Sequence, residues 1–460
     1  MSLLAFLDRD RSIAGPAFNR WLVPPAALAI HLCIGQAYAF SVFNIPMSKL
    51  LGINAASPDD WSLKALGWIF SIALGMLGIS AALFGKWLER VGPRKAMFAA
   101  MLCFSGGFWV AALGVALHQI ALVYLGYGVF GGIGLGLGYI SPVSTLIKWF
   151  PDRPGMATGM AIMGFGGGAM IGSPLSVLLM DHFKSPVSMG VTQAFIAMGL
   201  IYGLFMMVGI LLVRLPPPHW VPEGYIPPSQ PKKLVTSANV DVEQAWRTPQ
   251  FWLLWMVLCL NVTAGIGVLG QASPMIQEMF PGRISPSAAA GFVGLLSLFN
   301  LIGRFVWSSL SDSIGRKRTY MIYFTLGAVL YALVPTVGKN GNVILFVAGF
   351  GIILSMYGGG FSTIPAYLRD IFGSMHVSAI HGRLLTAWSA AAVLGPVLVN
   401  YIRDYQLSHG VPKTEAYSIT MYIMAGLLLA GFACNYRVAE VDRKYHFQDE
   451  STASAAASQV

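Results

Sequence analysis

Arg304 is the residue whose type and position point most directly to chemistry, because it is the one charged residue in the apolar run 287–311. It precedes Ser311 by seven residues, which is about 10 Å of helix. A guanidinium at that depth in a membrane is unfavourable unless it faces a wet cavity or a counter-charge. The apolar runs contain no acidic residue, and a planar guanidinium suits bidentate binding of a carboxylate. We therefore predict a carboxylate site at Arg304; the alternative is a side chain that extends to the adjacent charged loop.

Polar and aromatic residues in the middle of other apolar runs could complete such a site. Tyrosine and tryptophan present an apolar body with a hydroxyl or indole donor, so they can enclose a small anion. The alternative for each of them is ordinary helix packing. The candidates are Gln36, Tyr38, Tyr139, Tyr357, Phe361 and Trp388. His31, in the run 21–47, could bind a proton or be a packing residue.

The composition identifies the elements that must position these residues. Of the 460 residues, 56% are hydrophobic and 10% are charged, whereas a soluble domain is about 25% charged. The apolar residues form twelve runs long enough to cross a bilayer, so a soluble enzyme is excluded. The net charge of +10 comes from short loops, which argues against nucleic-acid binding. The four cysteines are isolated and predict neither a disulfide nor a metal site.

The twelve runs fall into two groups of six, so the fold class is an all-α membrane protein with two six-helix bundles. We assign a tail at 1–20, the first bundle at 21–214, a linker at 215–248, the second bundle at 249–437 and a tail at 438–460. The linker is rich in proline, which disfavours a long helix. The tail at 1–20 lacks the apolar segment of a signal peptide.

The distribution of Lys and Arg predicts the orientation. The tails, the linker and the loops on the same face hold three times as many of these residues as the loops on the other face. Because positive loops stay in the cytoplasm, we expect both termini and the linker there. The protein is then a multi-pass protein of the cell membrane, either an inner or a plasma membrane.

Two charged loops lie at matching points of the two halves. Gly85-Lys-Trp-Leu-Glu89-Arg90-Val-Gly-Pro-Arg94-Lys95 follows the second run, and Asp312-Ser-Ile-Gly-Arg316-Lys-Arg318 follows the eighth. The bundles are therefore pseudo-symmetric, as in transporters built from parallel repeats. The paired loops resemble the signature of the major facilitator superfamily. That resemblance implies a conformational latch at Gly85, Glu89, Arg90, Arg94, Asp312 and Arg316. The alternative is a charged turn that only orients the helices.

A second motif is narrower. The segment Trp149-Phe-Pro-Asp-Arg153-Pro-Gly155-Met-Ala-Thr-Gly159 resembles the oxalate:formate antiporter family, which overlaps with monocarboxylate carriers and implies small organic anions as cargo. The oxalate exchangers carry a second cation on the eleventh helix, but the run 384–402 has no Lys or Arg. Arg383 precedes that run, and we expect it in a loop. One cation suits one negative charge, so we predict a monocarboxylate such as formate, lactate or pyruvate, with an oxalate:formate-type exchanger as the alternative.

The coupling mode stays open at this point between proton symport, exchange and uniport. The resembling proton-coupled carriers place an aspartate one turn before the arginine, where this chain has Asn300. We therefore expect Asn300 to line the site without titrating, and His31 becomes the candidate for a coupled proton. From another functional class, the chain could be a transporter-like sensor of carboxylates. We expect no enzyme activity and no cofactor. The expected partners are a carboxylate, the bilayer and a proton, and we expect a monomer.

Overall fold

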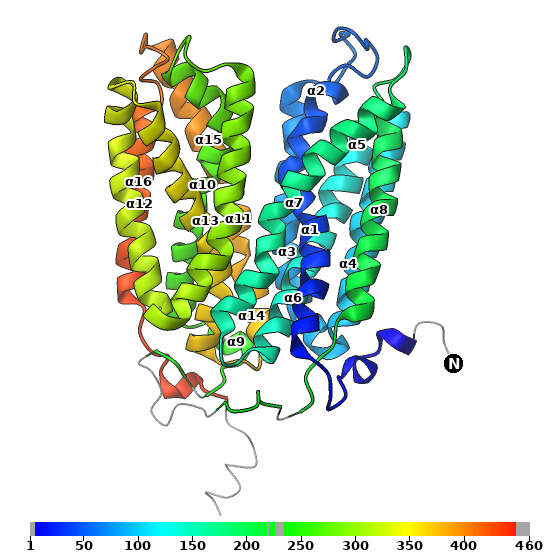
Figure 1. Ribbon diagram of the computed structural model, residues 1–460, viewed down its shortest axis with the longest axis vertical. Coiled ribbons are helices and arrows are strands. Elements are labelled where there is room, and N and C mark those ends of the chain that lie inside the picture. Colours follow the sequence, from blue (N-terminus) through cyan, green and yellow to red (C-terminus); the bar gives the residue numbers. More distant parts are fainter. Residues whose placement is uncertain (1–4, 219, 226–233, 237, 448–460) are drawn as a thin grey trace, which may run out of the picture.

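The computed structural model describes residues 5–218, 220–225, 234–236 and 238–447. In this part of the chain, twelve helices are long and apolar enough to cross a membrane, six before the linker and six after it. The chain is thus the all-α, twelve-helix protein predicted from its apolar runs. Figure 1 shows the two bundles side by side, with helices α9 (Val242–Ala245) and α14 (Val377–Leu384) at the end where the N-terminal segment also lies. This end is called the linker end below.

The first bundle begins after three short 3-10 helices in the N-terminal segment. Its first span bends through successive helical segments, and its fourth span contains a stretch of π-helix that continues into α-helix. The segments are η1 (Ala5–Leu7), η2 (Asp10–Ser12), η3 (Arg20–Leu22), α1 (Val23–Ile34), η4 (Gly35–Phe43), α2 (Asn44–Met47), α3 (Leu63–Val91), α4 (Pro93–Ala116), α5 (Ile120–Val123), η5 (Tyr124–Gly131), α6 (Gly132–Trp149), α7 (Pro154–Phe183) and α8 (Val191–Leu212).

The second bundle also has six spans, and a short 3-10 helix follows it. The segments are α10 (Pro249–Met279), α11 (Pro286–Ile314), α12 (Arg316–Lys339), α13 (Val343–Phe372), α14, α15 (Thr386–Ser408), α16 (Ser418–Arg437) and η6 (Arg443–Tyr445). Side-chain caps fix where several helices begin: Ser62 accepts from the third following N–H at the start of α3, and Thr248 does so at the start of α10. Such caps satisfy backbone donors that a helix start leaves unpaired.

The two charged loops turn at equivalent glycines. Helix α3 ends at Gly92 with φ 84°, and α11 ends at Gly315 with φ 90°. Only glycine adopts this region without steric penalty, and the next helix begins directly after each turn. The repeat seen in the sequence is therefore a repeat of backbone geometry.

The eleventh span begins earlier than the apolar run 384–402 predicts. It consists of α14 and α15, broken near Leu385, and it extends from Val377 to Ser408. Helix α14 packs closely against α3, since a Cβ on Gly382 would overlap the carbonyl oxygen of Ala81. Arg383 therefore lies in a helix and not in the loop where we expected it.

Candidate functional site

Arg304 lies on α11, where α7 and α13 pack against this helix, and is completely buried, with 0% exposure. Its Nε donates to Oδ1 of Asn300 at 2.9 Å, one turn earlier on the same helix. Its Nη1 donates to the carbonyl oxygen of Ile162 on α7, in the other bundle, at 3.4 Å. Its Nη2 is buried and has no hydrogen-bond partner. Among the described residues no carboxylate pairs with this guanidinium, so its charge is buried without compensation, which is strongly unfavourable.

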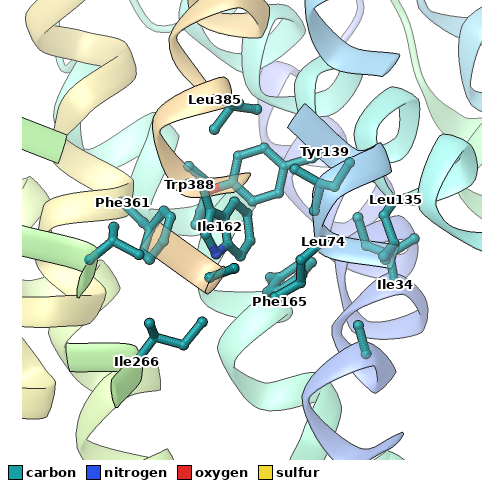
Figure 2. Close-up of a cluster of buried hydrophobic side chains, with 14 of the residues drawn as sticks. Ile34, Leu74, Leu135, Tyr139, Ile162, Phe165, Ile266, Phe361, Leu385 and Trp388 are labelled. Atoms are coloured by element: carbon teal, nitrogen blue, oxygen red, sulfur yellow. The ribbon is translucent and has the colours of Figure 1, made fainter. Parts of the chain in front are cut away.

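Aromatic rings from both bundles surround the guanidinium. Its central carbon lies 5.7 Å from the ring centre of Phe165 and 5.2 Å from that of Phe361. Trp388 on α15 packs against both, with centroid distances of 5.3 and 4.4 Å, and lies 5.4 Å from Tyr139 on α6. Figure 2 shows these four rings gathered from α6, α7, α13 and α15. Ring faces are attractive to cations, so the cage holds the charge in place without neutralising it.

A pair of tyrosines joins the two bundles beside this cage. The hydroxyl groups of Tyr38 on η4 and Tyr357 on α13 lie 3.1 Å apart, and the Tyr38 ring contacts Phe165 and Trp388. Gln36 does not belong to this group: its Oε1 accepts from the hydroxyl of Tyr127 at 2.9 Å, inside the first bundle. The structure therefore brings five of the six predicted pocket residues together and places Gln36 elsewhere.

The region around Arg304 contains several buried polar atoms without partners. Buried polar groups in folded proteins are almost always hydrogen-bonded, so a concentration of exceptions calls for an explanation. A bound carboxylate would satisfy the donors among these partnerless atoms. These atoms are Nη2 of Arg304, Nε2 of His31, the hydroxyl of Tyr139, Nε1 of Trp388 and Nε2 of His381.

Two members of this region were missed by sequence reasoning. Phe165 lies in the glycine-rich part of α7, where the glycines drew attention away from the single ring among them. His381 lies just before the apolar run 384–402, outside the predicted spans, and was not considered. The signal for His381 was present in the sequence: Val377, Ile380 and Leu384 have the 3–4 spacing of a helix face.

Glycines allow the neighbouring helices to approach the arginine. A Cβ at Gly166 on α7 would lie 3.1 Å from Nε of Arg304, and a Cβ at Gly358 on α13 would overlap the carbonyl oxygen of Asn300. Side chains at these positions would force α7 and α13 away from α11. The guanidinium is thus held between two backbones that only glycine permits at this distance.

We expect Gly358→Ala to lower both thermal stability and ligand binding. The added methyl group must push against the backbone of α11, and overpacking of this kind costs about 1–3 kcal/mol. The matched control is Gly349→Ala on the same helix, where a Cβ meets nothing within 4 Å. The measurement is the melting temperature of each purified variant in detergent. Equal melting temperatures for the two variants would contradict the proposed close contact.

In the second bundle, the charged loop caps a helix of the first bundle. The carboxylate of Asp312 accepts from the backbone N–H groups of Gly155 at 2.9 Å and Met156 at 2.8 Å, at the start of α7. Arg316 holds this carboxylate at 2.5 Å and also contacts Asp370 at 3.2 Å. A negative charge at a helix N-terminus is stabilising, so Asp312 ties the two bundles together at the linker end.

The matching loop of the first bundle contacts different partners. Glu89 accepts from the backbone N–H of Ala379 at 3.2 Å and lies 3.0 Å from Nδ1 of His376, at the start of α14. The hydrogen bond with Glu89 raises the pKa of His376 above its ordinary value. Gly85 permits this approach, since a Cβ there would lie 2.7 Å from Cα of Ala379.

The arginines of that first loop do not reach Glu89. Arg94 is buried and donates to the backbone carbonyl oxygens of Val213, Phe6 and Arg11, so it fastens the N-terminal segment to the first bundle. Arg90 is exposed. The acid–arginine pair that the family resemblance implies is therefore present at Asp312 and Arg316, while at Glu89 a histidine of the other bundle takes the place of the arginine.

Arg383 is engaged away from Arg304. Its guanidinium donates to both carboxylate oxygens of Glu243 on α9, at 3.1 and 2.5 Å, and lies over the ring of Trp246. Glu243 also accepts from Lys86 of α3 at 2.7 Å. The hydrogen bonds from Arg383 and Lys86 lower the pKa of Glu243 to about 2. The linker thus contacts both bundles. Arg383, the candidate for a second cation at the site, is paired with the linker residue Glu243.

Comparison with known proteins gives the same fold and a related group of carriers. The oxalate:formate antiporter of Oxalobacter formigenes is 28% identical over 385 residues, which cover 82% of this chain and 83% of the relative. Apicoplast pyruvate carrier 1 of Toxoplasma gondii is 24% identical over 512 aligned positions, covering 92% and 90% of the two chains. The chain therefore aligns with most of the length of both relatives.

A solved structure and a family model agree with this result. The proton:xylose symporter XylE superposes with a TM-score of 0.66 at 15% identity, over 92% of this chain and 96% of that protein. The model of the Major Facilitator Superfamily matches residues 26–281 and 272–458. With twelve spans in two pseudo-symmetric bundles and a matching charged loop in each, the chain belongs to the Major Facilitator Superfamily of membrane transporters.

Proposed function

We propose that this protein transports a small monocarboxylate across the cell membrane by alternating access, with the carboxylate bound at Arg304. The observation that carries the proposal is the completely buried guanidinium whose Nη2 has no partner and whose charge is not neutralised by a described acidic residue. A carboxylate supplies the missing charge and the missing acceptor together. The relatives named as an oxalate:formate antiporter and a pyruvate carrier support an organic anion as cargo.

The charge of the site favours one carboxylate group. The cage of Phe165, Phe361, Trp388 and the tyrosines surrounds one permanent cation, the guanidinium of Arg304. Arg383, which a second carboxylate would need, is paired with Glu243 at the linker end. A dianion would therefore bury one carboxylate without a partner, which costs several kcal/mol. A mono-anion such as formate, lactate or pyruvate fits this balance.

Contacts between the bundles at the linker end indicate which side of the protein is closed. Asp312 and Glu89 fasten the bundles together at the linker end, and Tyr38 meets Tyr357 beside the site. The excess of Lys and Arg at that end favours a cytoplasmic orientation for the linker and both tails. We therefore propose that the cytoplasmic side is closed here, and that transport requires these contacts to break.

The first test is uptake of labelled pyruvate and labelled oxalate by proteoliposomes that contain the purified protein, an inward proton gradient and no internal anion. We expect pyruvate to enter and oxalate to remain outside, because the site has a single cation. Pyruvate entry without an internal anion identifies symport or uniport, which the response to the proton gradient separates. Uptake that needs a preloaded carboxylate identifies exchange, and preferential oxalate uptake would contradict the one-cation site.

A further inference from the structure

Two buried histidines from opposite bundles face one tyrosine near the arginine. His31 on α1 is 0% exposed and His381 on α14 is 2% exposed. Their ring centres lie 5.4 and 5.9 Å from the ring centre of Tyr139 on α6. Nε2 of each histidine and the hydroxyl of Tyr139 are buried without a hydrogen-bond partner. In the proposed function the carboxylate binds at Arg304 and Tyr139 belongs to the surrounding cage, whereas the two histidines have no role in it.

The contacts of His31 determine which of its nitrogens can take a proton. Its Nδ1 lies 3.1 Å from the carbonyl oxygen of Ala27. A carbonyl oxygen only accepts hydrogen bonds, so Nδ1 must carry a hydrogen. The neutral ring then presents Nε2 as a bare acceptor in a buried position. Protonation of Nε2 would turn it into a donor, and a nearby acceptor would be needed to hold that proton.

The charge near this pair is positive. The positive charge of the Arg304 guanidinium on α11 disfavours a proton on His31, and a charge on His31 in turn disfavours a proton on His381. Among the described residues, Tyr139 on α6 is the titratable group whose ring contacts both histidines, and Tyr38 on η4 contacts Phe165 and Trp388 of the same cage. Tyrosine is ordinarily neutral at physiological pH. On α3, which packs against α14, Glu89 contacts His376 and Lys86 contacts Glu243, both at the linker end.

We propose that His31, Tyr139 and His381 form a proton-binding site that fills when a carboxylate occupies Arg304; this inference rests on the proposed function. Without the anion, the guanidinium repels an imidazolium in a region of low dielectric. A bound carboxylate neutralises the guanidinium and removes this repulsion. The proton then binds to Nε2 of one histidine, and the other histidine or the tyrosine hydroxyl accepts its hydrogen bond.

The charges of the transported species balance. One proton and one carboxylate enter the site from the same side and leave to the other side, so no net charge crosses the membrane. His31 belongs to the first bundle and His381 to the second, so rocking of the bundles separates the two rings. The proton then loses one of its partners at the same time as the carboxylate loses the contact of α7 with Arg304. Release of the two species is thereby linked.

The test is the pH dependence of pyruvate binding by the purified full-length protein in nanodiscs. If one proton binds with each anion, linkage requires the affinity to rise about tenfold for each pH unit lowered. We expect this slope for the unchanged protein and a flat response for the double variant His31→Gln/His381→Gln. Binding of neutral pyruvic acid would give the same slope in both proteins, so an unchanged slope in the double variant would overturn the proposal.

Controls separate this inference from the function on which it rests. His409→Gln, at the exposed end of α15, should keep the full slope. In proteoliposomes, the double variant should still exchange internal for external pyruvate, while accumulation driven by a proton gradient falls about tenfold or more. Proton-driven accumulation that equals the unchanged protein would overturn the inference. If Arg304→Gln still binds pyruvate, the carboxylate site itself is wrong. His31→Asn/His381→Asn serves as a second double variant if the first does not fold.

Discussion

Arg304→Gln is expected to abolish pyruvate binding and uptake while the protein stays folded. The substitution removes the charge that holds the carboxylate, and loss of one partner from a buried ion pair costs about 3 kcal/mol or more, which is about a hundredfold in affinity. Folding should not suffer, because the unliganded protein buries this guanidinium without a counter-charge. Glutamine is neutral and can still donate to Asn300. Binding of labelled pyruvate and the melting temperature are measured on the same preparation.

The matched control for this experiment is Arg383→Gln. Arg383 is also an arginine of the second bundle, but it is paired with Glu243 at the linker end. We expect this variant to bind pyruvate as the unchanged protein does. Pyruvate uptake that survives in Arg304→Gln would contradict the assignment of the site. Uptake lost in Arg383→Gln and kept in Arg304→Gln would place the carboxylate at the linker end.

Asp312→Asn is expected to shift the protein away from the conformation described here. The carboxylate caps α7 of the other bundle and is held by Arg316. Loss of a cap of this kind costs about 0.5–2 kcal/mol, which changes the ratio of two conformations by about 2- to 30-fold. The end opposite the linker should then close more often.

This shift can be measured as a distance between two spin labels at the end opposite the linker. Ile45 of the first bundle and Ile344 of the second are 63% and 81% exposed, so cysteines there can be labelled after the four native cysteines are replaced. We expect the short-distance population to grow in Asp312→Asn. Asp404→Asn is the control, because Asp404 pairs with Arg403 of its own bundle. Identical distance distributions in all three proteins would show that Asp312 does not hold this conformation.

The fold could be predicted from the sequence because its cause is simple. Apolar runs of sufficient length must cross the bilayer as helices, since backbone polar groups have no other partners there. The start of the eleventh span was misjudged because hydropathy finds the lipid-facing length of a span, whereas α14 contains polar residues and packs on α3 through Gly382. Contacts between helices affect the hydropathy pattern of a sequence much less than contacts with lipid do.

The candidate site was predictable in part, and the difference lies in what each residue type can do. A lone arginine in an apolar run has few acceptable environments, so Arg304 could be placed at the centre. Glutamine and tyrosine are tolerated in many places, and Gln36 proved to pair with Tyr127 inside the first bundle. Contacts between the bundles, such as Glu89 with His376, depend on the conformation that the protein adopts, which a single sequence does not encode in its pattern.

The contact between α7 and α11 has a consequence for the speed of the conformational exchange. Gly155, Gly159 and Gly166 place the backbone of α7 directly against α11, so few side chains interlock between these helices. Two smooth helix surfaces can slide over each other without first moving apart. The barrier to exchange then comes from the polar contacts between the bundles, which include those of Asp312, Glu89 and the Tyr38–Tyr357 pair, and the rate depends on how quickly these bonds break.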